Sequence, residues 1–341
     1  MSAQVAPYAP PKFRKPVPMT PPLTAFDPVY LQRKEELPER IFRLKSGRQL
    51  SYFTEGRVED PAVVCFPSAG LGKAEFITRE PIPGVYLVCI DDMGHGSSSQ
   101  LEHPVVFSES VPEIAELLDE LNVGKFYVCG HSRGGCHAMQ CAAALLGRVL
   151  GCAVISSPCD INHASLSKQE RKKVGGGAAM FNAKGCFGAL TRFFMKNVYY
   201  YPDKSKDFGF TGHMAGGYSY YKGKATGGAP KCMEKDHFFV TKLLDSELNG
   251  ANSKCALLYE MQGLFLPWSF DVAKIQCPCF LYHETDGEVP MVMAEQNKML
   301  IAGSELIVWP QHGHCSIAME FENIVVGLVE GKSVESRYDD Q

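Results

Sequence analysis

Short apolar segments alternate with amphipathic ones along most of this chain. Residues 62–66 and 85–90 are almost entirely apolar, which is typical of strands buried on both faces of a sheet. Apolar residues then recur with helical spacing over 111–121, and Ser110 and Pro112 indicate where that helix begins. The first half of the chain therefore predicts strands that are followed by helices.

The same alternation continues toward the C-terminus. We expect further strands at 126–129, 152–155, 279–283 and 306–309, and further helices at 136–146, 291–300 and 317–329. Residues 41–44 and 50–54, separated by Ser46-Gly47, predict a hairpin before the first buried strand. Strand–helix alternation of this kind predicts an α/β fold, with a mostly parallel central sheet flanked by helices.

Two stretches interrupt the pattern and suggest the domain organisation. Residues 1–38 are rich in proline and predict an extended arm, with regular structure starting at Ile41. Residues 161–272 hold glycine and aromatic clusters without a clear period, and they predict a lid or cap inserted into the sheet. The core would then comprise 39–160 and 273–332, followed by a polar C-terminal tail at 333–341.

Composition narrows the class of protein. The chain has 341 residues, 45% hydrophobic content and a formal net charge of -4, which favours a globular protein that binds no nucleic acid. No apolar run is long enough for an integral membrane span, and no secretory signal is evident, so we expect a cytoplasmic protein. Of the thirteen cysteines, five lie in apolar strand-like runs, which favours reduced, buried thiols over disulfides or a metal site. We expect no cofactor, and the oligomeric state stays open.

The strongest chemical signal is the run Gly130-His131-Ser132-Arg133-Gly134-Gly135, directly after a predicted strand and before a predicted helix. G-x-S-x-G in this context is a nucleophile elbow, in which a tight turn presents the serine hydroxyl above the sheet. Glycines are needed there because a side chain would collide with neighbouring backbone. The amide of Arg133, at the start of the helix, would face a developing oxyanion.

With this motif the sequence resembles the α/β-hydrolase family over about residues 40–330. Residues 91–98, Asp-Asp-Met-Gly-His-Gly-Ser-Ser, look like the family's D-x-x-G-x-G-x-S turn, a structural element that gives His95 no catalytic role. After the strand at 62–66 the family usually carries His-Gly, and here Pro67-Ser68 replaces it. The resemblance implies that the amide of Ala69 is the second oxyanion donor, with Ser68 or Gly70 as alternatives.

The resemblance also implies a base and an acid, in the chain order serine, acid, histidine. Asp286 follows the strand at 279–283, and His314 follows the last strand in a segment similar to the family's G-H-x-S ending. We therefore expect Ser132, Asp286 and His314 to form the catalytic triad. Alternative candidates for the acid are Glu284, Glu288 and Asp160, and the alternative candidate for the base is His312.

These residues predict a serine esterase that cleaves a small, partly apolar acyl ester without a metal. Ser68, Gly70 and His131 are expected to contact the substrate, and the Arg133 side chain would either bind a substrate carboxylate or pair with a carboxylate of the protein. Residues 162–236 carry a balance of about +8, which could favour an anionic substrate or contact with an anionic surface. A C–C bond hydrolase, an acyltransferase and a non-catalytic ligand-binding protein are the alternatives.

Overall fold

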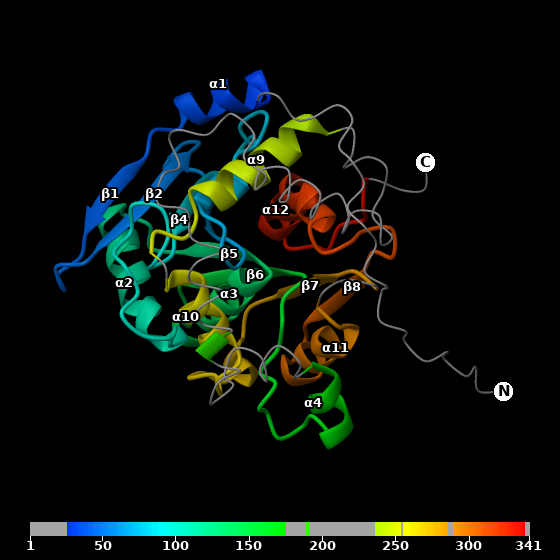
Figure 1. Ribbon diagram of the computed structural model, residues 1–341. Helices are drawn as coiled ribbons and strands as arrows, with labels where there is room; N and C mark the ends of the chain where they lie inside the picture. Colours follow the sequence, from blue (N-terminus) through cyan, green and yellow to red (C-terminus); the bar gives the residue numbers. More distant parts are fainter. Residues whose placement is uncertain (1–25, 175–188, 191–235, 254, 286–288, 338–341) are drawn as a thin grey trace, which may run out of the picture.

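The computed structural model describes residues 26–174, 189–190, 236–253, 255–285 and 289–337, and these residues form one eight-stranded sheet (Figure 1). The strand order is β1-β2-β4-β3-β5-β6-β7-β8. The strands are β1 (Arg40–Arg43), β2 (Gln49–Glu55), β3 (Ala62–Phe66), β4 (Tyr86–Asp91), β5 (Phe126–His131), β6 (Val149–Ile155), β7 (Cys279–His283) and β8 (Glu305–Val308). The first two pairings are antiparallel and the remaining ones are parallel, as the sequence predicts.

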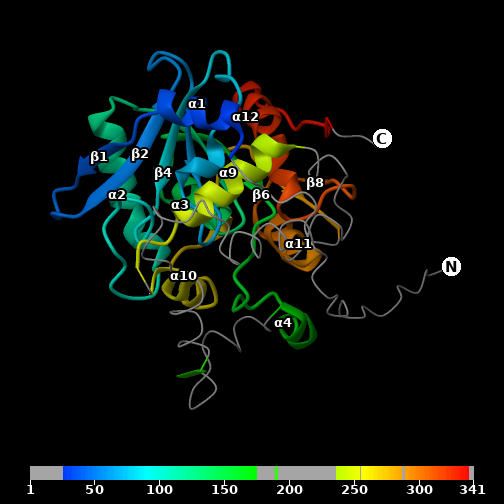
Figure 2. The ribbon, with the colours of Figure 1, turned by 45° about the horizontal axis from the view of Figure 1, so that its top comes forward.

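Helices cover both faces of this sheet (Figures 1 and 2). One face carries α2 (Phe107–Glu120) and α3 (Arg133–Ala144), and α11 (Met291–Leu300) packs against β7 and β8. The other face carries α12 (Phe321–Glu330), the 3-10 helix η1 (Lys73–Phe76), α1 (Pro28–Glu36) and α9 (His237–Leu248). Both faces need covering because the buried strands are apolar on both sides. In β3, Val64 and Phe66 pack in the core under α3, whereas Val63 and Cys65 pack in the core on the other face of the sheet. The predicted α/β fold is confirmed.

The helix predicted from Ser110 begins one turn earlier, at Phe107. Pro112 lies inside α2 and does not mark its start, and the Ser110 hydroxyl donates to the Phe107 carbonyl at 2.9 Å. Phe107 is buried and packs edge-on against Trp268. Tertiary packing of this aromatic ring thus sets the beginning of the helix, which the local pattern could not show.

The prediction that regular structure starts at Ile41 is wrong, because α1 precedes it. The Asp27 carboxylate accepts hydrogen bonds from the Val29 and Tyr30 amides at 2.9 and 3.2 Å, and Pro28 occupies the first helical position. Tyr30 is fully buried and donates to Asp245 of α9 at 2.5 Å. The end of the predicted arm is therefore a docked helix, whereas residues 1–25 lie outside the described part.

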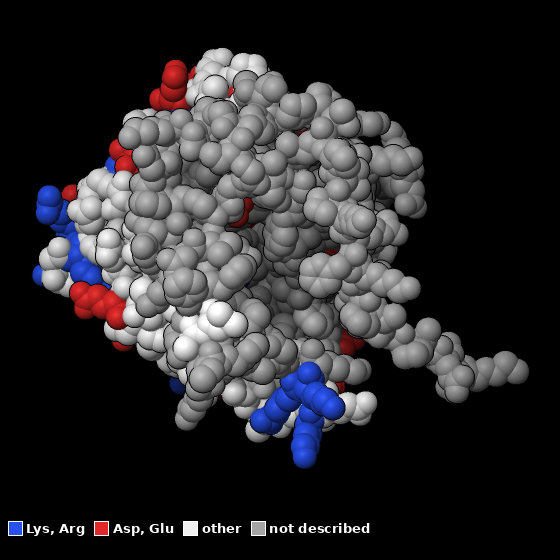
Figure 3. All heavy atoms as spheres, in the orientation of Figure 1, with Lys and Arg blue, Asp and Glu red and all other residues white. Residues whose placement is uncertain are grey.

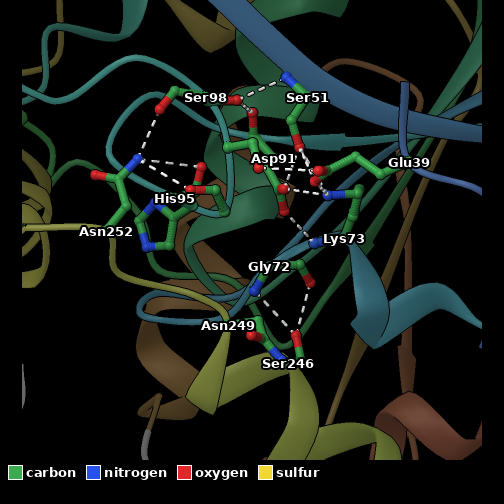
Figure 4. Close-up of polar contacts among 12 residues, drawn as sticks. Glu39, Ser51, Gly72, Lys73, Asp91, His95, Ser98, Ser246, Asn249 and Asn252 are labelled. Carbon is green, nitrogen blue, oxygen red and sulfur yellow. Dashed lines mark hydrogen bonds and ion pairs between the residues drawn. The ribbon is translucent and has the colours of Figure 1, made fainter. Parts of the chain in front are cut away.

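Within the predicted insertion, the structure describes α4 (Lys168–Val174), α9 and α10 (Ala256–Leu264), and the 3-10 helix η2 (Val272–Lys274) lies at its C-terminal boundary. The C-terminal half of the insertion is joined to the body, as Figure 4 shows: the Gly72 amide donates to the Ser246 hydroxyl at 2.9 Å, and Asn252 donates to the Ser98 carbonyl at 2.6 Å. Basic side chains gather over α4 (Figure 3). Most of the basic stretch at residues 162–236 lies outside the described residues. The lid boundaries at residues 161 and 272 also stay a prediction. Every helix in the described ranges is too short or too polar to cross a bilayer.

Candidate active site

The turn between β5 and α3 has the geometry that the glycine motif predicts. Ser132 adopts φ 54° and ψ -123°, a conformation that few non-glycine residues take. A Cβ on Gly130 would lie 2.1 Å from the Gly134 carbonyl oxygen, and one on Gly134 would lie 1.9 Å from that of Phe66. Backbone crowding therefore requires both glycines, and this prediction is confirmed.

Ser132 lies beside the histidine that the sequence selects as base. The Ser132 hydroxyl is 3.1 Å from Nε2 of His314, which sits in the loop between β8 and the 3-10 helix η3 (Ser316–Glu320). Both side chains are partly exposed, although most residues around them are buried. A hydroxyl and an imidazole nitrogen at hydrogen-bond distance can act as nucleophile and base.

The carboxylate beside His314 in the described part of the chain is that of Glu284. Its Oε1 lies 3.4 Å from His314 Nδ1, and the residue is fully buried one position after β7. Burial acts to raise the pKa of this carboxyl, but the hydrogen bond and charge of His314, with help from Ser156, lower the pKa to about 2. Asp286 and Glu288 lie outside the described residues, and their roles stay predictions.

Ser156 is a polar residue of this site that the sequence reasoning missed. It directly follows β6, is fully buried, and its hydroxyl lies 2.6 Å from His314 Nδ1 and 2.8 Å from Glu284 Oε1. Its φ of 43° is positive, as at Ser132. The available signal was its place as the first polar residue after the apolar run 152–155, at the sheet edge that carries Ser132.

The loop after β3 lies next to Ser132 because β3 and β5 are parallel neighbours. Two of its amides are already engaged: Ser68 donates to Glu75 at 2.8 Å, and Gly70 donates to Glu260 at 2.9 Å. Among the described residues, the Ala69 amide has no hydrogen-bond acceptor. Of the three candidate donors, Ala69 is therefore the one whose amide is available.

His131, expected to contact substrate, is buried and engaged through both ring nitrogens. Nδ1 is paired with Glu75 and also lies 2.7 Å from the Ser68 hydroxyl, while Nε2 lies 2.9 Å from the His314 carbonyl oxygen. Burial disfavours the imidazolium, but the Glu75 carboxylate outweighs it and raises the pKa of His131. The ring thus connects the loop after β3 to the backbone of His314.

The Arg133 side chain pairs with carboxylates of the protein, one of the two predicted alternatives. Its guanidinium is 1% exposed and lies 2.5 Å from Asp92 and 2.6 Å from Glu260 of α10. It also lies 2.6 Å from Nε2 of His137. Burial lowers the pKa of His137 to about 4, so this ring is a neutral acceptor. Glu260, which the sequence reasoning did not single out, also pairs with His95 at 3.2 Å.

The remaining rival residues lie in other contacts. His312 is buried against Ser336 at 3.0 Å and Glu320 at 3.7 Å, and Asp160 accepts from the Asn162 amide at 2.8 Å. Asp91, at the end of β4, binds Ser51 and Lys73 and holds the following turn, in agreement with a structural role (Figure 4). No cluster of three or more potential metal ligands occurs within the described ranges.

Comparison with known proteins supports the fold. The chain is similar to a hydrolase from Pseudomonas aeruginosa PA01 (18% identity, TM-score 0.58, covering 85% of this chain and 98% of that one). It is also similar to the enol-lactonase from Burkholderia xenovorans LB400 (16% identity, TM-score 0.60, covering 85% of this chain and 100% of that one). A third similar structure is an esterase from Exiguobacterium antarcticum (14% identity, TM-score 0.58, covering 86% of this chain and 100% of that one). A search of curated proteins gave no match. The model of the alpha/beta hydrolase family matches residues 63–323, and this chain belongs to that family.

Proposed function

We propose that the protein is a serine hydrolase that cleaves a carboxylic ester, with Ser132 as nucleophile and His314 as base. The contact of 3.1 Å between the Ser132 hydroxyl and His314 Nε2, at a turn with positive φ on Ser132, carries this proposal. An enol-lactonase and an esterase share the fold, and we extend their reaction class to this chain. The substrate would be small and partly apolar.

In the proposed mechanism, His314 Nε2 takes the Ser132 proton while the hydroxyl oxygen attacks the ester carbonyl. The tetrahedral intermediate collapses when His314 returns that proton to the leaving alcohol, and an acyl-enzyme is left on Ser132. Water then gives a proton to His314 and attacks the acyl carbon. Collapse of this second intermediate releases the carboxylic acid and restores the Ser132 hydroxyl.

The amides of Ala69 and Arg133 would stabilise the oxyanion in both halves of the reaction. Arg133 is the first residue of α3, so its amide is one of those that an α-helix leaves without an internal acceptor. The Ala69 amide is available while those of Ser68 and Gly70 are engaged. A donor of this kind contributes about 3 to 4 kcal/mol in comparable sites. The buried side chain of Arg133 is held by carboxylates, which leaves it no role in binding an anionic substrate.

For the acid we propose Glu284, with Asp286 as the alternative. Glu284 is buried and lies 3.4 Å from His314 Nδ1. Glu284→Gln and Asp286→Asn are matched amide substitutions that decide between the two residues. Loss of the acid should lower kcat roughly 10³- to 10⁴-fold, as expected for the orienting carboxylate of a triad, and the other substitution should change it little.

The experiment combines fluorophosphonate labelling with hydrolysis of p-nitrophenyl esters of varied acyl length and charge. The wild-type protein should be labelled on Ser132 and should hydrolyse short esters. Ser132→Ala should lose both properties while its thermal unfolding stays cooperative. A folded wild-type protein that neither reacts with the probe nor hydrolyses any ester of the panel would contradict the proposal.

A further inference from the structure

We propose that Ser156 is a positioning residue that links His314 to Glu284 through its hydroxyl and fixes the tautomer in which His314 can act as a base. This inference rests on the proposed function, since it assigns His314 the task of accepting the Ser132 proton. Ser156 itself touches no substrate and acts through His314.

The distances favour a relay over a direct contact. The Ser156 hydroxyl lies 2.6 Å from His314 Nδ1 and 2.8 Å from Glu284 Oε1, whereas the imidazole and the carboxylate are 3.4 Å apart. Hydrogen bonds from a ring N–H to oxygen are usually about 2.9 to 3.0 Å long. The hydroxyl is therefore the closer partner of both groups.

Counting protons gives the relay a direction. Glu284 is ionised at neutral pH because its pKa is lowered to about 2, so its oxygens only accept hydrogen bonds. The Ser156 hydroxyl has a single proton, which it donates in a hydrogen bond to this carboxylate. His314 Nδ1 must then donate to the Ser156 oxygen, which leaves Nε2 unprotonated and facing the Ser132 hydroxyl at 3.1 Å. This is the tautomer that a general base requires.

The backbone holds the Ser156 hydroxyl in this place at a conformational cost. Ser156 has φ 43°, a left-handed conformation that favours glycine, and its amide donates to the Tyr282 carbonyl at 2.8 Å. One strand away, the Ser132 amide donates to the Ile155 carbonyl at 2.7 Å. Strands β5 and β6 are neighbours in the sheet (Figure 1). The two serines therefore follow neighbouring strands, and the next strand holds each of them in a turn with positive φ. Strain of this kind at a buried polar residue points to a functional need for its side chain.

The same arrangement would serve when His314 becomes charged. After taking the Ser132 proton, the imidazolium donates from Nδ1 to the Ser156 oxygen, and the Ser156 hydroxyl continues to donate its hydrogen bond to Glu284. The negative charge thus stabilises the imidazolium through one hydroxyl, and no proton is transferred to the carboxylate. Loss of the hydroxyl should therefore affect kcat and leave substrate binding nearly unchanged.

Two substitutions separate the hydroxyl from the backbone. Ser156→Ala removes the hydroxyl and keeps the strain, whereas Ser156→Gly removes the hydroxyl and tolerates φ 43°. Both should lower kcat for a p-nitrophenyl ester about 10- to 100-fold, as expected for one hydrogen bond to a charged group, with KM within about twofold. Ser157→Ala is the matched control, because Ser157 is also buried but its hydroxyl contacts Cys136 and the Pro158 carbonyl. It should retain wild-type kcat.

Nitrogen-15 NMR of histidine-labelled protein at pH 8 tests the tautomer without any substrate, with His314→Gln as the assignment variant. The wild-type spectrum should show His314 protonated at Nδ1, and both Ser156 variants should lose this fixed form. A wild-type His314 protonated at Nε2 would overturn the relay even if no variant folds. Equal activity of all variants, or loss in Ser156→Ala that Ser156→Gly restores, would also overturn it while leaving the proposed function intact. A folded wild-type protein that reacts with neither the probe nor any ester would instead contradict the proposed function.

Discussion

Arg133→Met should destabilise the protein strongly, because it leaves two buried carboxylates without their common cation. The guanidinium is 1% exposed and lies within 2.6 Å of both Asp92 and Glu260, neither of which is more than 9% exposed. Burial opposes ionisation of both groups, yet nearby cations keep both pKa values below the usual range. Breaking such a pair by removing one partner costs about 3 to 5 kcal/mol.

The cost should depend on pH in a defined direction. Without Arg133, Glu260 keeps His95 and the Gly70 amide as partners, but burial then raises the pKa of both carboxyls above their unfolded values, which are about 4. Such groups are tolerated when protonated, so the penalty is small near the unfolded pKa and grows as pH rises through the folded pKa. The gap in unfolding free energy between wild type and Arg133→Met should therefore be largest at pH 8 and smaller at pH 5.

Urea unfolding followed by tryptophan fluorescence measures this gap, since both tryptophans of the chain, Trp268 and Trp309, are buried. Arg133→Lys keeps the charge but cannot reach several acceptors with a planar fork, so its cost should be intermediate. Adding Glu260→Gln to Arg133→Met should restore part of the loss. A cost below about 1 kcal/mol, equal at both pH values, would refute the reasoning.

Two further substitutions test the elbow and the C-terminal segment. Gly134→Ala should prevent stable folding or abolish labelling by the fluorophosphonate probe, because its Cβ would lie 1.9 Å from the Phe66 carbonyl oxygen. Gly124→Ala is the control: a Cβ there would meet no neighbouring atom within 4 Å, so the midpoint of thermal unfolding should be nearly unchanged. Burial opposes ionisation of Glu320, but hydrogen bonds from His312 and from the Ser336 hydroxyl at 2.6 Å lower its pKa to about 2. Because this folded pKa is below the unfolded one, the stabilisation is present above pH 4 to 5 and lost as pH falls toward 2. At pH 7 the free energy of unfolding in urea should be about 1 to 2 kcal/mol higher for wild type than for Glu320→Gln, and an equal difference at pH 3 would contradict this.

The strands could be predicted because local pattern and tertiary environment agree there. Fully buried β3 and β4 are apolar runs flanked by polar turns, and the elbow after β5 combines a rare glycine pattern with strong steric demands. The helix ends were harder to predict, since the start of α2 depends on the packing of Phe107 against Trp268, a residue more than 150 positions away in the sequence. The spacing of apolar residues shows which face of a helix or strand is buried more reliably than it shows where that element begins.

The polar partners of the site could not be predicted for a related reason. Ser132 and His314 belong to motifs, but Ser156 and Glu260 acquire their importance from residues distant in sequence: Ser156 from Glu284 and His314, and Glu260 from Arg133. A serine after a strand and a glutamate in an amphipathic segment are common in any soluble protein. Their function appears once the sheet order is known.

The position of Glu260 also changes what the inserted segment is. It lies on α10, inside the stretch predicted as a lid, yet it is fully buried and binds both the Arg133 guanidinium next to Ser132 and the Gly70 amide of the loop after β3. A lid that opened as one unit from residue 161 to residue 272 would expose Arg133 without its second carboxylate, at a cost of several kcal/mol. The α10 segment is therefore part of the framework that shapes the site.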